Sequence, residues 1–157
     1  MNPMKRSEDA FGRPATPLIL RPAVHPPPGG RPLFAHAVRA GFPSPADDYV
    51  ADTLDLNEHL IRHREATFFV RARGHSMLGA GIHDNDLLVV DRALTARHGS
   101  IVIAVVDGEF TVKRLEKRGA RVRLRAEHPD YAPIDFQDGQ ELHVWGVVTQ
   151  VIHSFVA

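Results

Sequence analysis

Cysteine is absent from this chain of 157 residues. The absence excludes a disulfide framework, a thiol nucleophile and a metal site built on cysteine, and it suits a cytoplasmic location. Long apolar runs are also missing, since the longest, such as residues 101–106, are far too short to span a bilayer. No secretory signal is expected, because Pro14, Pro17 and Pro22 interrupt the apolar residues near the N-terminus. The sequence therefore predicts a cytoplasmic protein with no membrane association.

An excess of charge of one sign is missing as well. The 19 basic and 19 acidic residues give a formal net charge of zero. A protein that grips DNA on its own usually carries a basic excess that neutralises phosphates, so strong direct DNA binding is not expected. With 43% hydrophobic and 24% charged residues, the composition is that of a globular protein with one core-forming domain and a tail.

Proline is concentrated on the N-terminal side of the chain. All prolines except Pro129 and Pro133 lie within residues 1–45, where they disfavour helices and central strands. We therefore expect residues 1–46 to form an extended, mostly disordered arm and residues 47–157 to form the folded domain. The arm is too short and too rich in proline for a helix-turn-helix DNA-binding domain.

The rest of the chain has mainly the pattern of β-structure. Residues 55–63 predict a short helix with Asp55 as its N-cap. Apolar runs then predict a series of strands, and Asp107-Gly108 between two of them predicts a hairpin with a type I′ turn. The strands are expected at residues 67–72, 86–91, 101–106, 109–115, 121–125 and 141–151. This pattern predicts a mainly β fold of twisted antiparallel strands, preceded by the flexible arm.

Ser76 and Lys113 are the candidate catalytic residues. Ser76 lies in a turn that begins at Gly74, and Lys113 lies on a predicted strand, on the same face as Leu115. A buried lysine can remove the proton of a serine hydroxyl if its pKa falls by roughly 3 units from about 10.4. The backbone amides of His75 and Ser76 are candidates for stabilising an oxyanion. Taken alone, each residue also has an ordinary interpretation, because most turn serines are structural and most strand lysines are solvated.

The bond between Ala40 and Gly41 is a possible substrate within the same chain. Both residues are small, and they lie in the predicted arm. Together with Ser76 and Lys113, this bond indicates a protein that cuts its own N-terminal arm.

Two other kinds of active site fit the sequence less well. A histidine-based hydrolase has ten histidines to draw on, but the Gly-x-Ser-x-Gly elbow would need a glycine where Leu78 stands. A zinc site at His59 and His63 would need a glutamate directly after His59, whereas Glu58 precedes it. Residues 84–86 lack the glycine and distal glutamate of a calcium-binding loop. No metal and no cofactor are therefore expected.

Four blocks of the sequence carry a family resemblance. They are residues 40–45, Tyr49 followed by residues 55–57, residues 74–91, and residues 99–115. Over most of the chain, from about residue 40 to residue 151, they resemble the UmuD-like proteins of the LexA-like serine peptidase family, self-cleaving accessory subunits of error-prone DNA polymerase V. The blocks are specific as a set, whereas any one of them alone is weak.

The resemblance implies a role for each candidate residue. Ser76 would be the nucleophile, Lys113 the general base, and the backbone amides of His75 and Ser76 the oxyanion hole. The scissile bond would be Ala40-Gly41. The resemblance also implies a LexA/UmuD-like peptidase domain that forms a homodimer and cleaves itself when stimulated by RecA filaments on single-stranded DNA. The product would join a UmuC-like Y-family DNA polymerase catalytic subunit for translesion synthesis in the SOS response.

The chain departs from the family pattern in three respects. Position 75 is histidine where aspartate is common, Ala40 matches LexA-like repressors where some UmuD proteins have cysteine, and the arm is longer than usual. These departures leave open an alternative, a non-cleaving interaction module of the same fold that regulates a Y-family polymerase. A repressor role is less expected, because a repressor carries a helix-turn-helix domain before its cleavage site.

Overall fold

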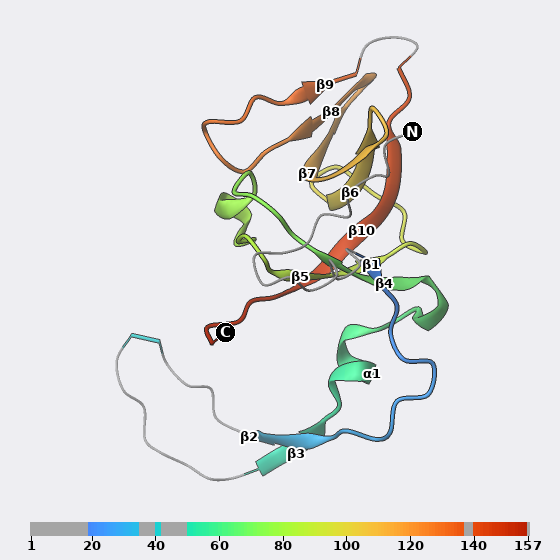
Figure 1. The fold of residues 1–157 in the computed structure, drawn as a ribbon, viewed down its shortest axis with the longest axis vertical. Coiled ribbons are helices and arrows are strands. Elements are labelled where there is room, and N and C mark those ends of the chain that lie inside the picture. Colours follow the sequence, from blue (N-terminus) through green and yellow to red (C-terminus); the bar gives the residue numbers. More distant parts are fainter. Residues whose placement is uncertain (1–18, 35–39, 42–49, 137–139, 157) are drawn as a thin grey trace, which may run out of the picture.

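The computed structural model describes residues 19–34, 40–41, 50–136 and 140–156 (Figure 1). Its elements are β1 (Ile19–Leu20), β2 (Arg31–Phe34), β3 (Val50–Leu54), α1 (Leu56–Leu60), a 3-10 turn (Arg64–Ala66), β4 (Thr67–Arg71), a second 3-10 turn (Leu78–Ala80), β5 (Leu87–Asp91), β6 (Ile101–Val106), β7 (Glu109–Arg118), β8 (Arg121–Arg125), β9 (Ile134–Asp135) and β10 (His143–Ile152). The mainly β fold predicted from the sequence is confirmed.

Eight of the described strands form one antiparallel sheet in the order β1-β4-β5-β10-β6-β7-β8-β9. β10 pairs with β5 along one edge and with β6 along the other, and its register shifts once on each side. Such bulges bend a strand and increase its twist. In Figure 1, β10 (red) therefore connects the β4–β5 part of the sheet with the β6–β9 part. β2 and β3 form a separate two-stranded sheet.

The hairpin of β6 and β7 has the predicted turn. Asp107 has φ 50° and Gly108 has φ 81°, and a type I′ turn requires positive φ at both central residues. The pairing places Val102 opposite Lys113. β7 continues beyond its predicted end because its second half pairs with β8, up to Arg118 opposite Arg121.

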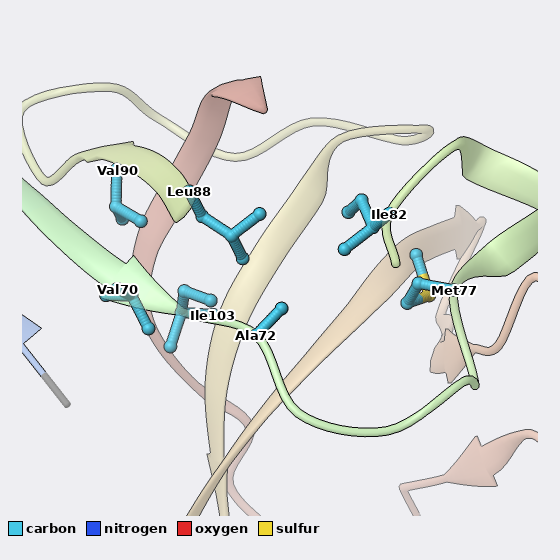
Figure 2. Close-up of a cluster of buried hydrophobic side chains, with 7 residues drawn as sticks. All are labelled: Val70, Ala72, Met77, Ile82, Leu88, Val90 and Ile103. Carbon is cyan, nitrogen blue, oxygen red and sulfur yellow. The ribbon is translucent and has the colours of Figure 1, made fainter. Parts of the chain in front are cut away.

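Buried side chains form two clusters on opposite faces of β6. Consecutive side chains of a strand alternate between its faces, so Ile103 enters one cluster and Val102 the other. Figure 2 shows the first cluster, which consists of Val70, Ala72, Met77, Ile82, Leu88, Val90 and Ile103. The second consists of Val102, Ala104, Leu115 and Leu124. The segment between β4 and β5 is thereby built into the first cluster through Met77 and Ile82.

Two short strands in the N-terminal arm are absent from the sequence prediction. β1 adds to the free edge of β4, with Ile19 opposite Val70. Two further contacts hold this part of the arm: the Arg21 guanidinium lies 5.1 Å from the centre of the Phe68 ring, and a side-chain N–H of Arg64 donates to the carbonyl of residue 24 (2.8 Å). The described part of the arm is extended, as predicted, but it is paired with the domain.

The second arm strand, β2, pairs with β3 just before α1. Asp55 caps α1 as predicted, accepting a hydrogen bond from the amide of Asn57 (2.8 Å), and it also accepts one from the amide of Gly29 (3.1 Å). The helix ends at Leu60, earlier than predicted, because the backbone is already extended at Ile61 (φ −113°, ψ 101°). The predicted domain boundary after residue 46, residues 42–45 and Tyr49 lie outside the described residues. No helix in the described ranges has both the length and the apolar character to cross a membrane.

Candidate active site

Ser76 lies in the loop between β4 and β5 (residues 73–86, the serine loop). Gly74 turns the chain at the start of this loop with φ 86°, a conformation that costs glycine little. A backbone hydrogen bond from Ala72 N–H to the carbonyl of Asp86 (2.9 Å) closes the base of the loop. The ends of the serine loop are therefore held together like the ends of a hairpin.

The serine loop is fixed from both sides. Met77 and Ile82 are each 2% exposed and point into the first core cluster (Figure 2). On the other side, the backbone of Glu127, just after β8, donates to the carbonyl of Ser76 (2.8 Å) and accepts from the amide of Gly79 (2.8 Å). Ser76 thus sits between a buried anchor and a backbone clamp.

Lys113 reaches Ser76 from β7. Its Nζ donates hydrogen bonds to Ser76 Oγ (2.9 Å), Thr111 Oγ1 (2.9 Å) and the carbonyl of Val112 (3.0 Å). Lys113 is 9% exposed, and Leu115, on the same face of β7, is fully buried. The prediction that Lys113 points inward is confirmed, and the structure brings the two candidate catalytic side chains into contact.

The surroundings of Lys113 suit both protonation states of its amine. Burial lowers the pKa of Lys113 from its ordinary value of 10.5, because removal from water disfavours the charged form. As an ammonium, Nζ has three N–H groups for its three acceptors. As a neutral amine, it keeps two N–H groups for Thr111 and Val112 and offers its lone pair to the hydroxyl of Ser76. A general base is neutral before it accepts a proton and charged afterwards. In both forms each N–H group of Lys113 Nζ has a hydrogen-bond acceptor here.

The backbone amides of His75 and Ser76 are available as oxyanion donors. Neither N–H donates a hydrogen bond to any residue in the described ranges. An amide that points at an open position beside a nucleophile can stabilise the negative charge of a tetrahedral intermediate. The side chain of His75 is exposed. It is not the cause of the lowered pKa of Lys113, because that pKa is lowered by burial.

A cavity opens beside the pair. Its apolar walls come from Val70, Ala72, Leu88, Ile103, Phe110 and Val112, and its polar lining comes from Arg71, Arg73, Ser76, Thr111 and Lys113. Apolar walls with a few convergent polar groups are typical of a site that holds a ligand and excludes water from the reacting atoms.

The predicted scissile bond is not in the site. Ala40 and Gly41 are both exposed, and a side chain placed on Gly41 would meet no atom within 4 Å. In Figure 1, the segment 40–41 lies on the side of β2 and β3, apart from β6 and β7. The structure brings Ser76 and Lys113 together but leaves Ala40-Gly41 away from them.

Two residues of the site are missing from the sequence prediction. Strand alternation places Thr111 on the same face as Lys113, so its position could be predicted. Its hydrogen bond to Lys113 Nζ could not be predicted from the sequence. Glu127 acts through its backbone, which carries no sequence signal. Its side chain is also held by ion pairs with Arg114 and Arg125.

A serine that accepts a hydrogen bond from a buried lysine, beside backbone amides that no described residue uses, has the groups that nucleophilic attack on a carbonyl requires. Comparison with known families agrees, because the Peptidase S24-like family matches residues 32–149. The chain belongs to this family.

Individual relatives support a closer assignment. Protein SamA of Salmonella typhimurium is 48% identical over 137 residues, which cover 87% of this chain and 95% of that protein. Protein ImpA of Escherichia coli is 51% identical over 125 residues, covering 78% of this chain and 83% of its own. A LexA repressor of Aliivibrio salmonicida is 36% identical over 138 residues, covering 87% of this chain and 66% of the repressor. The predicted resemblance to UmuD-like proteins of the LexA family is confirmed.

Proposed function

We propose that this protein is a self-cleaving serine peptidase that cuts its own Ala40-Gly41 bond, with Ser76 as nucleophile and Lys113 as general base. The observation that carries the proposal is the 2.9 Å contact between Nζ of the buried Lys113 and Oγ of the half-buried Ser76. Membership in the Peptidase S24-like family supports the same chemistry.

The proposed reaction begins when neutral Lys113 takes the proton of Ser76 and Oγ attacks the carbonyl carbon of Ala40. The carbonyl oxygen becomes an oxyanion that the amides of His75 and Ser76 stabilise. The C–N bond to Gly41 then breaks, and the Lys113 ammonium donates its proton to the departing amine. Water hydrolyses the resulting ester with Lys113 again as base. The products are the arm fragment and a chain of residues 41–157.

This reaction requires the arm to move, because the segment 40–41 lies apart from Ser76 in the described conformation. We propose that a conformation with Ala40-Gly41 placed at Ser76 exists as a minor state, and that a RecA filament on single-stranded DNA favours this state. A ligand shifts such an equilibrium only through its preference for one of the two states. Without stimulation the chain would therefore cut itself slowly.

The proposed biological role follows the resemblance to UmuD-like proteins. The cleaved chain would act as a homodimer in the cytoplasm and serve as accessory subunit of a UmuC-like Y-family polymerase in translesion synthesis during the SOS response. Residues 1–46 would be the arm that contains the cleavage site, of which residues 1–40 are removed, and residues 47–157 the peptidase and dimerisation domain. The relatives at 46–51% identity, among them Proteins SamA, ImpA and MucA, support this role.

Mass spectrometry of the full chain tests the proposal directly. At alkaline pH, which raises the neutral fraction of Lys113, we expect a fragment that begins at Gly41. Ser76→Ala and Lys113→Ala should each abolish this product. Lys117→Ala is the matched control, because Lys117 lies on the same strand but is exposed, and it should cut like the native chain.

A chain that stays intact at alkaline pH and with RecA filaments would overturn the proposal. The same result would favour the second candidate, a non-cleaving interaction module of this fold that regulates a Y-family polymerase. The observation in favour of this candidate is the separation of the segment 40–41 from the site. Unchanged cutting by Lys113→Ala would instead reject lysine as the base.

A further inference from the structure

Two histidines and one carboxylate converge at a place away from the candidate active site. His83 and Asp86 come from the end of the serine loop, and His153 follows β10 near the C-terminus. Their potential ligand atoms all lie within 4.8 Å of one another. The two imidazole rings lie side by side, with centroids 4.6 Å apart.

The carboxylate of Asp86 is the fixed member of the group. Its side chain is 2% exposed, and Oδ2 accepts a hydrogen bond from the backbone amide of His83 (2.7 Å). The two rings address different oxygens of this carboxylate: His83 Nδ1 lies 3.6 Å from Oδ2, and His153 Nδ1 lies 2.5 Å from Oδ1. Both rings turn the same kind of nitrogen toward one anchored anion.

We propose that His83, Asp86 and His153 form a binding site for a divalent transition-metal ion of the Zn²⁺ class. Two imidazoles with one carboxylate are ligands that Zn²⁺ accepts, whereas Mg²⁺ and Ca²⁺ prefer oxygen alone. The side chains of His83 and His153 are 50% and 37% exposed, which leaves the outer side of the group open to water as a further ligand. Their exposure also provides a path for the ion.

The spacing of the donors fits one ion after a small adjustment. A tetrahedral metal with bonds of about 2.0–2.2 Å holds its donors roughly 3.3–3.6 Å apart. The separation of His83 Nδ1 from Asp86 Oδ2, 3.6 Å, already meets this requirement. His153 Nδ1 lies 2.5 Å from the other oxygen, Oδ1, so this ring must withdraw by about 1 Å from its direct hydrogen bond to make room for an ion. The ligand atoms of the group, which lie within 4.8 Å of one another, must also close to the spacing that the ion sets, and the partial exposure of both rings permits these movements.

Metal binding here would act on the serine loop. Asp86 accepts the backbone hydrogen bond from Ala72 that closes the base of this loop, and His153 belongs to the C-terminal segment. An ion held by both would therefore tie the C-terminus of the chain to the base of the loop that carries Ser76. Only the folded chain brings the three ligands together, so the ion should bind the folded state in preference and raise the unfolding temperature.

A titration of the untagged, full-length chain with Co²⁺ and Zn²⁺ tests the site. Visible absorption of four-coordinate Co²⁺ should appear and saturate at one ion per chain, and Zn²⁺ should displace it. His83→Gln and His153→Gln should each weaken Zn²⁺ binding, measured by calorimetry, by about 10–100-fold or more. A loss of that size is typical even when the residue removed only hydrogen-bonds to a ligand. Both side chains are partly exposed, so these variants should keep the native fold, which circular dichroism checks.

His63→Gln is the matched control. His63 Nδ1 lies 2.6 Å from a buried carboxylate oxygen of Asp91, with a side chain 49% exposed, but within the described part of the chain it belongs to no group of three metal-ligand side chains. This variant should bind Co²⁺ and Zn²⁺ like the native chain. The proposal is wrong if the native chain binds neither ion, if His83→Gln and His153→Gln bind as tightly as the native chain, or if His63→Gln loses binding equally. Since metal binding is the readout, the result does not depend on whether the chain cuts itself.

Discussion

Replacing Gly79 with alanine tests how the backbone clamp positions the nucleophile. A Cβ at this position would lie 2.7 Å from the carbonyl oxygen of Glu127, where ordinary contact begins at 3.4 Å. The serine loop and the segment at Glu127 would therefore have to separate by about 0.7 Å, since tightly packed backbone has no room to absorb the overlap. The obstacle is a backbone atom and cannot be relieved by a side-chain rotation.

This separation should reach the catalytic pair. It would stretch the 2.8 Å hydrogen bond from Gly79 to Glu127 beyond bonding range and disturb the bond that Glu127 donates to Ser76. A misplacement of about 1 Å at a reacting group can cost on the order of 100-fold in rate. We expect Gly79→Ala to cut about 10–100-fold more slowly than the native chain. Its free energy of unfolding should fall by about 1–3 kcal/mol.

The assay combines the rate at which the Gly41 fragment forms at alkaline pH with urea unfolding of the uncut chain. Gly119→Ala is the control, because Gly119 has φ 59° but nothing within 4 Å of the added Cβ. That variant should lose about 1–2 kcal/mol through backbone strain in the β7–β8 turn and still cut normally. A folded Gly79→Ala variant that cuts at the native rate would refute the clamp.

Three further outcomes follow from the buried groups. The pKa of Lys113 is lowered in the folded state, so the native chain should gain stability as pH rises toward the ordinary value of 10.5. Lys113→Met should lack that gain, which urea unfolding of both chains at about pH 7 and about pH 10 measures. An equal change in the free energy of unfolding between the two pH values in both chains would contradict a buried amine. Thr111→Val should slow cutting and lower the free energy of unfolding at about pH 7 by about 1–3 kcal/mol, because it leaves one N–H of the buried Lys113 Nζ without an acceptor. Thr149→Val is the control, because it removes a hydroxyl that donates to the carbonyl of Val89 away from the site, and it should cut like the native chain. Leu124→Ala should cost about 2–5 kcal/mol, because Leu124 is fully buried in the second cluster, and a smaller loss in urea would mean that the cluster collapses around the gap.

The sequence predicts best the features whose causes are local. The hairpin at Asp107-Gly108 follows from two adjacent residues that tolerate positive φ, and the inward face of Lys113 follows from strand alternation. The two-residue strands β1 and β9 were not predictable, because each exists only through its pairing, β1 with the edge of β4 and β9 with β8. Their own residues carry no strand pattern of sufficient length.

The candidate site was only partly predictable for a similar reason. The serine and lysine were candidates from their own sequence contexts, and the family resemblance gave each a role, whereas their contact depends on how the serine loop packs against β7. The Glu127 clamp consists of backbone hydrogen bonds that any residue can make. The metal-ligand candidates His83 and Asp86 are close in the sequence, but His153 joins them from 67 residues beyond Asp86, a separation that no spacing motif describes.

The pairing of β1 with β4 separates two events that are easily treated as one. Hydrolysis at Ala40-Gly41 would break the chain well after β1, so the fragment would keep its strand pairing, the contact of Arg21 with Phe68 and the hydrogen bond from Arg64. The severed arm would then remain as a bound peptide whose departure has its own rate. The edge of β4 would become available to another strand only after that departure, so the moment of cutting and the moment of exposure would differ.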